Sequence, residues 1–444
     1  MTSPHPKTSP SETAAEREAR IQRLLREVEK TLREALPELD QPLEKIEQDS
    51  LDLGRQMQEI VERDTLESLG RGYLGPHAPC ACGAPARFVT QTARVLVTRG
   101  GVRRLCRAYY HCAACRKGFC PLDQWLKLGA GECSIGVRAL AARFASYLPF
   151  RKAAEELALV CGVRLSAGTV RRIAQGVGAA IEASWAEQER RLWAGQAPAS
   201  GQRPRQVQVG MDGVLIRIGN EWKEVKVGEV YHPRPGGGVA RIQYYATRRD
   251  AVAFGRRLRT LAHAEGVPFC RAVGTVGDGI DWIWREAAKH FPRSEEILDY
   301  YHALQHLWQL AHARFKSSEE AHAWIGRQQR RLLEQEEGVG AVIEAVAEWE
   351  PRGEEAAEVK RRVGNYLQGH AHRMRYKRLR EQGYHIGSGV VEAGCKSVVQ
   401  ARLKGAGMRW SEAGAEAMLH LRASWCSTGS TDFRAAARAA SSVS

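Results

Sequence analysis

The stretch that most constrains the fold is QVQVGMDGVLIRI, residues 206–218. Up to Met211, apolar and polar residues alternate with the period of two that is typical of a half-buried strand, and a second β-rich run continues to Ile218. Asp212 and Gly213 stand where the two runs meet. We interpret the stretch as two short strands that meet at an acid, with a simple Asp-Gly hairpin turn as the alternative.

Two more acids lie in comparable contexts. The run RAVGTVGDG, residues 271–279, is β-rich, reaches Asp278 at its end and is followed at once by a helical pattern. Glu392 lies about one turn into another predicted helix, with Lys396 on the same helix face. Two strand-borne aspartates and a helix-borne glutamate can hold two divalent ions roughly 4 Å apart, as phosphoryl transfer requires. We therefore predict that Asp212 and these two acids are catalytic ligands of two Mg²⁺ or Mn²⁺ ions.

The charge of the chain indicates a polyanionic partner. The 444 residues carry a formal net charge of +15, and basic surface gains affinity by releasing counterions from phosphates. Ribosome-associated and membrane-surface proteins share this property. No apolar run approaches the roughly 18 residues of a membrane span, and the N-terminus lacks the apolar core of a signal peptide. We therefore expect a soluble, cytoplasmic protein, associated with the nucleoid and without a membrane partner.

Two close cysteine pairs indicate a structural zinc site. The pairs are Cys80 with Cys82 and Cys112 with Cys115. Between them, two predicted strands, 88–98 and 102–110, form a hairpin that returns the second pair to the first. Four thiolates would then surround a tetrahedral Zn²⁺ with no open position for water, so the metal would be structural. The odd total of 11 cysteines fits reduced thiols better than a secreted disulfide framework.

The first cysteine pair departs from the usual zinc-ribbon spacing. It is C-x-C, whereas ribbons commonly have C-x-x-C. One ligand of the four could therefore be replaced by Cys106, Cys120 or His77. Simple reduced cysteines are the alternative to a zinc site.

The segment before the central strands has a helix-turn-helix pattern. A helical stretch from Phe150 leads through a glycine-containing turn to a second helix that Ser166 would cap. Thr169, Arg171 and Arg172 on this second helix would then lie near double-stranded DNA. An ordinary helical hairpin is the alternative.

The motifs together resemble those of the DDE transposases of bacterial insertion sequences, most closely the ISKra-type and Mutator-like branch. The matching motifs, spread over roughly residues 80 to 425, are MDG at Asp212, GDG-x-x-W-I-W from Asp278, D-x-x-H at Asp299 and His302, and GSGVVEAGCK around Glu392. The resemblance implies an RNase H-like catalytic domain that cleaves transposon ends and transfers the strands into target DNA. It also places His302 close to the active site, where a role at the scissile phosphate or beside a metal ligand competes with a merely hydrogen-bonded histidine.

The basic run after Glu392 suits the positioning of a DNA backbone. We expect DNA contacts from Lys396, Arg402, Lys404, Arg409 and Trp410. The tryptophan would stack on a displaced base. The alternatives are a solvated charged face for the basic residues and a place in the core for the tryptophan.

The predicted fold class is α/β, with an RNase H-like mixed sheet interrupted by a helical insertion. The predicted regions are disorder over 1–12, a helical region over 13–70 that would either dimerise or pack on its own chain, a zinc ribbon over 80–125, a helix-turn-helix region over 130–194, the catalytic domain over 206–426 with its insertion at about 303–380, and a disordered tail over 427–444. A transposase of this kind would act as a homodimer or larger synaptic complex. A nuclease of the same fold without strand transfer and a non-catalytic DNA-binding repressor derived from a transposase are the alternative functions.

Overall fold

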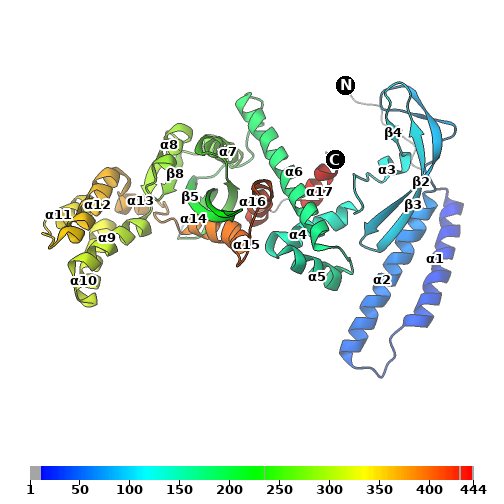
Figure 1. The fold of residues 1–444 in the computed structure, drawn as a ribbon, viewed down its shortest axis with the longest axis horizontal. Helices are drawn as coiled ribbons and strands as arrows, with labels where there is room; N and C mark the ends of the chain where they lie inside the picture. Colours follow the sequence, from blue (N-terminus) through cyan, green and yellow to red (C-terminus); the bar gives the residue numbers. More distant parts are fainter. Residues whose placement is uncertain (1–11, 235, 430–431, 443–444) are drawn as a thin grey trace. The chain divides into compact units, whose positions relative to one another are not determined.

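The structure is a computed structural model that describes residues 12–234, 236–429 and 432–442. It contains helices and two sheets, so the predicted α/β class is confirmed (Figure 1). The chain divides into two compact units, which are described separately: the first comprises the described parts of 1–145, 150–173 and 433–444, and the second those of 146–149 and 174–432. Among the described helices, none combines the length and the apolarity needed to cross a membrane.

The first unit begins with two long helices, α1 (Ala14–Ala35) and α2 (Leu43–Ser68). Thr13 and Glu16 form a capping box at the start of α1, because each side chain bonds the backbone N–H of the other residue. Arg20 connects the two helices, because its Nε lies 2.6 Å from an oxygen of the buried Asp64. The predicted helical segments are therefore present.

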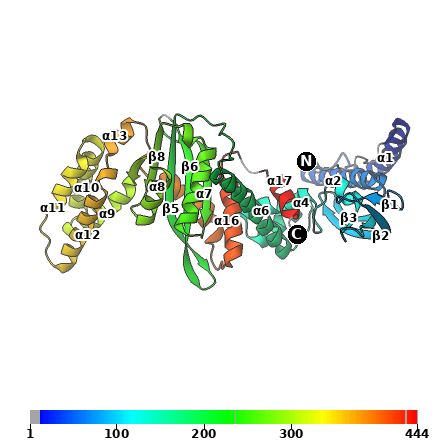
Figure 2. The same ribbon diagram turned by 90° about the horizontal axis from the view of Figure 1, so that it is seen from above.

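A small antiparallel sheet follows in the order β1-β2-β3-β4. Its strands are β1 (His77–Pro79), β2 (Pro85–Thr98), β3 (Gly101–His111) and β4 (Gly118–Phe119). The long β2–β3 hairpin matches the hairpin expected between the cysteine pairs, with Thr98 opposite Gly101 at its turn. Figure 2 shows this sheet beside the two N-terminal helices.

Five further helices lie wholly or partly in the first unit. They are α3 (Pro121–Trp125), α4 (Ile135–Tyr147), α5 (Phe150–Cys161), α6 (Ala167–Trp193) and α17 (Phe433–Ser442). Helix α17 shows that residues 433–442 are helical, so the predicted disorder of the C-terminal tail is wrong for these residues. The segment FRAAARAASS is rich in the helix-former alanine, Ala437 is buried, and the backbone oxygen of Ser441 accepts a hydrogen bond from Ala130 at 3.0 Å. Residues 1–11 of the predicted N-terminal disorder lie outside the described residues.

The second unit is built on a mixed sheet with the strand order β7-β6-β5-β8-β9. The strands are β5 (Gln206–Ile218), β6 (Glu221–Pro233), β7 (Val239–Thr247), β8 (Ala272–Gly277) and β9 (Glu295–Leu298). The first three are antiparallel neighbours, whereas β5 pairs with β8, and β8 with β9, in parallel.

The interpretation of residues 206–218 as two strands is wrong. They form one strand, and the hairpin turn lies at Gly219, which has a φ of +57°, and Asn220. Asp212 and Gly213 stay extended because β6 pairs with them, residue by residue, through Val227 and Lys226. Local turn propensity therefore yields to long-range pairing. The sheet's third antiparallel strand is β7, for which no strand was predicted.

Helices cover the sheet on both faces. Helices α7 (Ala251–Ala264) and α8 (Asp281–His290) pack with the apolar residues that β5 directs to one face, including Val209 and Met211. The opposite face of β5 and β6 carries the short helix α14 (Gly389–Gly394) and a π-helical turn, η3 (Cys395–Gln400). This second face also carries Asp212.

A mostly helical segment separates β9 from α14. Its helices are α9 (Tyr300–Arg314), α10 (Ser318–Glu334), α11 (Gly338–Ala347), α12 (Glu354–His370) and α13 (Tyr376–Glu381). After η3, helix α15 (Ala401–Leu403) and helix α16 (Glu412–Cys426) complete the unit. In Figure 1 the helices α9 to α12 form a group on the β8 side of the second unit.

Candidate active site and metal centre

The strand register aligns three aspartates in one row. In the parallel pairing of β5 with β8, Gly210 lies beside Val276, so two residues farther along Asp212 comes level with Asp278. In the pairing of β8 with β9, Gly277 lies beside Leu298, so Asp299 comes next to Asp278 on the other side. Neighbouring strands are only about 4.8 Å apart. Carboxylates separated by 66 and 21 positions in sequence are therefore neighbours in space.

Asp212 and Asp278 are partly buried and have few donors. Asp212 accepts hydrogen bonds from the N–H of Gly213 at 2.6 Å and from the thiol of Cys395 at 3.3 Å. Asp278 accepts one from the N–H of Ile280 at 3.0 Å. Burial raises the pKa of both aspartates, and the negative charge of Asp278 also raises the pKa of Asp212. Such a concentration of buried acid is stabilised by a bound cation.

Glu392 lies on the helix that packs over this acid row. Helix α14 contacts β5 and β6, and Cys395, three residues after Glu392, is the residue that reaches Asp212. The carboxylate of Glu392 itself is exposed and lies 2.8 Å from the ammonium of Lys396. An exposed pair of this kind contributes only about 0.3–0.5 kcal/mol, so Lys396 holds the Glu392 side chain only weakly.

The three predicted catalytic acids do not form a compact metal cage by themselves. Among the described residues, the group of ligand atoms that lie within 4.8 Å of one another consists of cysteines, and Asp212, Asp278 and Glu392 are not in it. The donor set is nevertheless suited to Mg²⁺ or Mn²⁺, because these ions prefer carboxylate oxygens and water. The assignment of Asp212, Asp278 and Glu392 as ligands of these ions stays a prediction.

His302 lies within electrostatic reach of both aspartates. Its positive form lowers the pKa of Asp212 and of Asp278. The His302 ring is 5.2 Å from that of His306 and 6.3 Å from that of Tyr366, a residue of the helical segment. Tyr366 also approaches the Asp278 loop, since a Cβ at Gly279 would lie 3.0 Å from its ring. The helical segment thus forms one side of the acid site.

Asp299 connects the start of α9 to the start of α14 through hydrogen bonds. One of its oxygens accepts hydrogen bonds from the N–H groups of Tyr301 at 2.9 Å and Ser388 at 3.0 Å, and the other accepts one from the Ser388 hydroxyl at 2.5 Å. The Ser388 side chain, at the start of α14, therefore bonds Asp299 and makes no capping hydrogen bond to its own helix. Asp299 holds the start of the helix that carries Glu392.

Gln208, on the same strand as Asp212, connects this strand to His385 through two further hydrogen bonds. It is completely buried, and its amide donates to the backbone oxygen of His385 at 2.9 Å and accepts from the His385 N–H at 2.8 Å. Residues 385–388 are thus fixed both to β5 and to the end of β9. These contacts explain how Glu392, which is distant in sequence from Asp212 and Asp278, is placed over the sheet.

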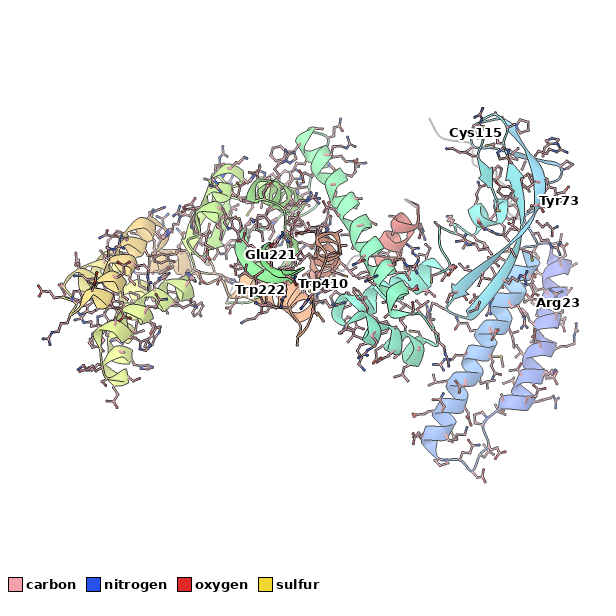
Figure 3. All side chains as sticks on the ribbon, in the orientation of Figure 1. Arg23, Tyr73, Cys115, Glu221, Trp222 and Trp410 are labelled. Carbon is pink, nitrogen blue, oxygen red and sulfur yellow. The ribbon has the colours of Figure 1, made fainter. Side chains whose placement is uncertain are left out.

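The four predicted zinc ligands come together in the first unit. The Sγ atoms of Cys80, Cys82, Cys112 and Cys115 all lie within 4.8 Å of one another. The Cys80–Cys115 and Cys82–Cys112 sulfur distances are 3.6 Å, close to the roughly 3.8 Å that a Zn–S distance of about 2.3 Å imposes in a tetrahedron. Figure 3 shows Cys115 at one end of the small sheet.

Cys82 completes the cluster despite the C-x-C spacing. The alternatives Cys106, Cys120 and His77 are not part of it. The N–H of Cys115 and the thiol of Cys82 lower the pKa of Cys112 to about 7. A readily ionised thiol among three others is suited to a soft cation such as Zn²⁺. The cluster can therefore bind zinc.

The predicted DNA contacts after Glu392 divide into exposed and buried residues. Lys396, Lys404 and Arg409 are exposed, whereas Arg402 and Trp410 are 2 % and 8 % exposed. The Trp410 indole donates to the Leu403 oxygen at 3.0 Å. The expected stacking of Trp410 on a base does not fit this structure, because its ring is buried in the core, and Arg402 is likewise buried and not on the surface.

Trp222 is the exposed aromatic residue of this region. It lies at the tip of the β5–β6 hairpin, opposite Arg217, next to the strand position that Trp410 bridges (Figure 3). Its ring is 57 % exposed and lies 5.5 Å from the ammonium of Lys404. A single tryptophan in a β-rich run has no sequence pattern that distinguishes an exposed from a buried side chain, so Trp222 was not among the predicted DNA contacts.

The predicted helix-turn-helix residues lie at the start of α6. Ser166 caps this helix by accepting from the N–H of Thr169 at 3.1 Å, as expected. Arg171 and Arg172 are exposed, and Arg172 donates to the Thr169 hydroxyl at 3.1 Å. The turn before the helix contains Gly162, whose φ is +66°. Contact of these residues with DNA remains a prediction.

The comparisons with known proteins cover the C-terminal part of the chain. Residues 262–438 match the model of a family described as Uncharacterised protein family (UPF0236). The matched region includes Asp278, Asp299, His302 and Glu392, and it begins after Asp212. The family description names no activity, and no curated protein matches the chain. The case for a function therefore rests on the site.

Proposed function

We propose that this protein is a DDE transposase with an RNase H-like catalytic domain, which cleaves double-stranded DNA at the ends of an insertion sequence and transfers the strands into target DNA. The observation that carries the proposal is the placement of three acids. Asp212 and Asp278 are level with each other on adjacent parallel strands, and Glu392 is on a helix packed against the strand of Asp212.

The sheet supports the fold assignment within this proposal. Three antiparallel strands followed by two parallel ones, with the first strand central in the order β7-β6-β5-β8-β9, are the arrangement that an RNase H-like domain requires. In such a sheet the first and fourth strands are neighbours. Acids on these two strands therefore meet without any contribution from loops.

The acidic residues would hold two Mg²⁺ or Mn²⁺ ions. Asp212, Asp278 and Glu392 are the proposed ligands. When bound, such ions activate a water or a 3′-hydroxyl for in-line attack and stabilise the leaving oxygen. His302 would add a positive charge beside both aspartates, which suits it to a phosphate bound at this site.

The remaining residues would bind and position DNA. Lys396, Lys404 and Arg409 offer exposed positive charge near Glu392 for the phosphate backbone. In the first unit, the zinc-binding sheet and the start of α6 would recognise the transposon ends, with Arg171 and Arg172 on the exposed face. Exposed leucines on the N-terminal helices, such as Leu25 and Leu51, offer a surface for a homodimer or a larger synaptic complex at the nucleoid.

The test uses DNA that carries the sequences flanking this gene on both sides. Purified full-length protein is incubated with this DNA and Mg²⁺, Mn²⁺ or EDTA, and 3′ ends and joined products are mapped. Metal-dependent nicks at fixed boundaries, together with joined products, are expected. Asp212→Asn and Asp278→Asn should abolish both, whereas Asp281→Asn, an exposed acid on the adjacent helix, should not.

Other outcomes would select another function. Cleavage without joined products would replace the transposase by an RNase H-like nuclease. Specific binding without cleavage would favour the DNA-binding repressor. Full activity of Asp212→Asn would contradict the assigned metal site.

A further inference from the structure

Glu229 is a buried acid that the proposed mechanism does not yet use. It lies on β6, is 1 % exposed, and its Oε2 has no hydrogen-bond partner among the described residues. Moving an unpaired carboxyl group from water into a protein interior costs several kcal/mol. Buried polar atoms without a partner are rare in folded proteins and require an explanation.

The glycines around Glu229 direct its carboxyl group toward the acid row. Across the strand pair, Glu229 lies opposite Gly210, and a Cβ at Gly210 would lie 1.9 Å from its Oε1. On the helix side, a Cβ at Gly394 would lie 3.6 Å from its Oε2. The carboxyl group therefore occupies the space that Gly210 leaves open over β5. Asp212 follows Gly210 by two residues, about 6.6 Å along the strand and on the same face.

No cation in the described part of the chain accounts for this acid. No ion pair to Glu229 is formed there, and the charge that acts on it is the negative charge of Asp212. Burial and this charge raise the pKa of Glu229 well above its usual range. The contact between Asp212 and Cys395 lies in the same region, and burial, together with the charges of Asp212 and Glu229, raises the pKa of the Cys395 thiol. The site thus contains more acid than the protein neutralises.

Glu286 provides a comparison within the same unit. It is also buried, at 2 % exposed, and its Oε2 also lacks a hydrogen bond. However, Nε2 of His290 lies 3.3 Å away, and the positive charges of Lys289 and Arg285 act against the rise that burial causes in the pKa of Glu286. Glu286 therefore has cationic neighbours among the described residues, whereas the charge that acts on Glu229 is the negative one of Asp212.

We propose that Glu229 is a fourth carboxylate of the metal site, which binds a divalent cation together with Asp212, directly or through a water molecule. This inference rests on the metal site of the proposed function and adds a residue to it. A divalent cation would supply the positive charge that the described structure lacks around Glu229. It would also explain why a glutamate occupies a position where a neutral side chain would cost less.

The experiment measures Mn²⁺ binding to the full-length protein without DNA. Mn²⁺ titrations followed by electron paramagnetic resonance and calorimetry compare wild type, Glu229→Gln and the control Glu286→Gln. Urea unfolding in EDTA gives the stability of the same proteins. We expect Glu229→Gln to weaken Mn²⁺ binding roughly 10- to 100-fold and to be as stable as wild type or more stable in EDTA. Glu286→Gln should leave Mn²⁺ binding unchanged.

These two readouts separate a ligand from a structural residue. A purely structural Glu229 would lower the stability in EDTA and leave Mn²⁺ affinity intact, which would overturn the inference. Glu229→Met, which fills a similar volume, provides a second variant. If neither variant folded in EDTA, the acid would be required by the metal-free fold, and the inference would also fail.

The outcome is independent of the DNA reaction. If Mn²⁺ binding depended on Glu229 but the wild-type protein did not cleave DNA, the metal site would be supported and the transposase function rejected. If the wild-type protein cleaved DNA and Glu229→Gln bound Mn²⁺ as tightly as wild type, the transposase function would be supported, and Glu229 would not be a ligand of the metal site. Absence of Mn²⁺ binding by wild type would reject the inference, whatever the DNA assay shows.

Discussion

The side chain of Gln208 pairs with the backbone of His385 through two hydrogen bonds, of 2.9 and 2.8 Å, across 177 positions of sequence. Gln208 lies on the strand of Asp212, and His385 lies in the segment that leads to Glu392. Gln208 is completely buried and His385 is half-buried, so the protein partly shields these two hydrogen bonds from water. This contact and the Asp299–Ser388 hydrogen bonds both connect the segment before α14 to the sheet.

Replacement of Gln208 should therefore weaken both the fold and the site. Gln208→Ala leaves the N–H and C=O of His385 unpaired, at a cost of about 1–3 kcal/mol each. We expect a loss of about 2–4 kcal/mol in urea unfolding and a fall in DNA cleavage at temperatures where the variant is folded. Gln243→Ala is the matched control, because Gln243 makes an exposed bond to the Thr428 oxygen; an equal loss in both variants would contradict the prediction.

Asp299 is expected to position the helix of Glu392 and not to bind the catalytic cation. Its three acceptor contacts go to Tyr301 and Ser388. Asp299→Asn keeps an oxygen for the two N–H donors, so it should retain part of the cleavage rate that Asp299→Ala loses, with similar KM for DNA. Single-turnover cleavage measures this difference. If Asn were as inactive as Ala while Mn²⁺ affinity fell in both, Asp299 would be a metal ligand.

The sequence predicts those parts of the site whose signal is local. Asp278 ends a β-rich run that leads directly into a helical pattern, and both the strand and its end are present at these positions. The cysteine pairs flank a hairpin, and pairing in antiparallel register is sufficient to bring all four thiols together. In each case neighbouring residues in sequence determine the placement.

The parts that were missed or misread depend on distant partners. Asp212 stands where two β-rich runs meet, which predicts a strand end at this position, whereas pairing of Asp212 and Gly213 with Val227 and Lys226 keeps both residues inside one strand. Glu229 has no sequence signal as an acid of the site, since its direction depends on the glycine opposite it on another strand. Trp410 was assigned to the DNA surface because it follows basic residues, and only its bridge to Ile218 reveals its burial.

Loss of zinc should unfold the small sheet. Cys112→Ser removes one of four ligands from the cluster, and metal binding contributes directly to the folding of such small domains. We expect one zinc per chain in wild type by mass spectrometry of the metal, and less than one in Cys112→Ser, with increased protease sensitivity of residues 77–119. Cys106→Ser is the control on the same strand, because Cys106 is exposed and outside the cluster. Equal zinc content in the two variants would contradict the prediction.

Acid should destabilise the second unit through Glu416. Burial alone would raise the pKa of this residue, but the imidazole of His420, the Thr247 hydroxyl and the N–H of Arg248 lower it to about 2. A carboxyl group with a depressed folded pKa stabilises the protein above its unfolded pKa, here 4.5, and this contribution disappears as the pH falls toward 2. The shift corresponds to on the order of 2–3 kcal/mol. Urea unfolding of wild type and Glu416→Gln should therefore differ at pH 6 and converge below pH 3; a constant difference would contradict the assignment.

Arg402 and Lys404 are close in sequence but should respond oppositely to substitution. Lys404 is exposed beside Trp222, so Lys404→Ala should weaken DNA binding and lower the slope of log affinity against log salt by about 1, with unchanged stability. Arg402 is buried, with its guanidinium 5.3 Å from the Trp410 ring, so Arg402→Ala should cost about 2 kcal/mol or more in unfolding free energy. Fluorescence anisotropy over a salt series and urea unfolding measure the two effects. A reduced salt slope for a fully folded Arg402→Ala protein would show that Arg402 reaches the DNA after all, and that this segment rearranges when DNA binds.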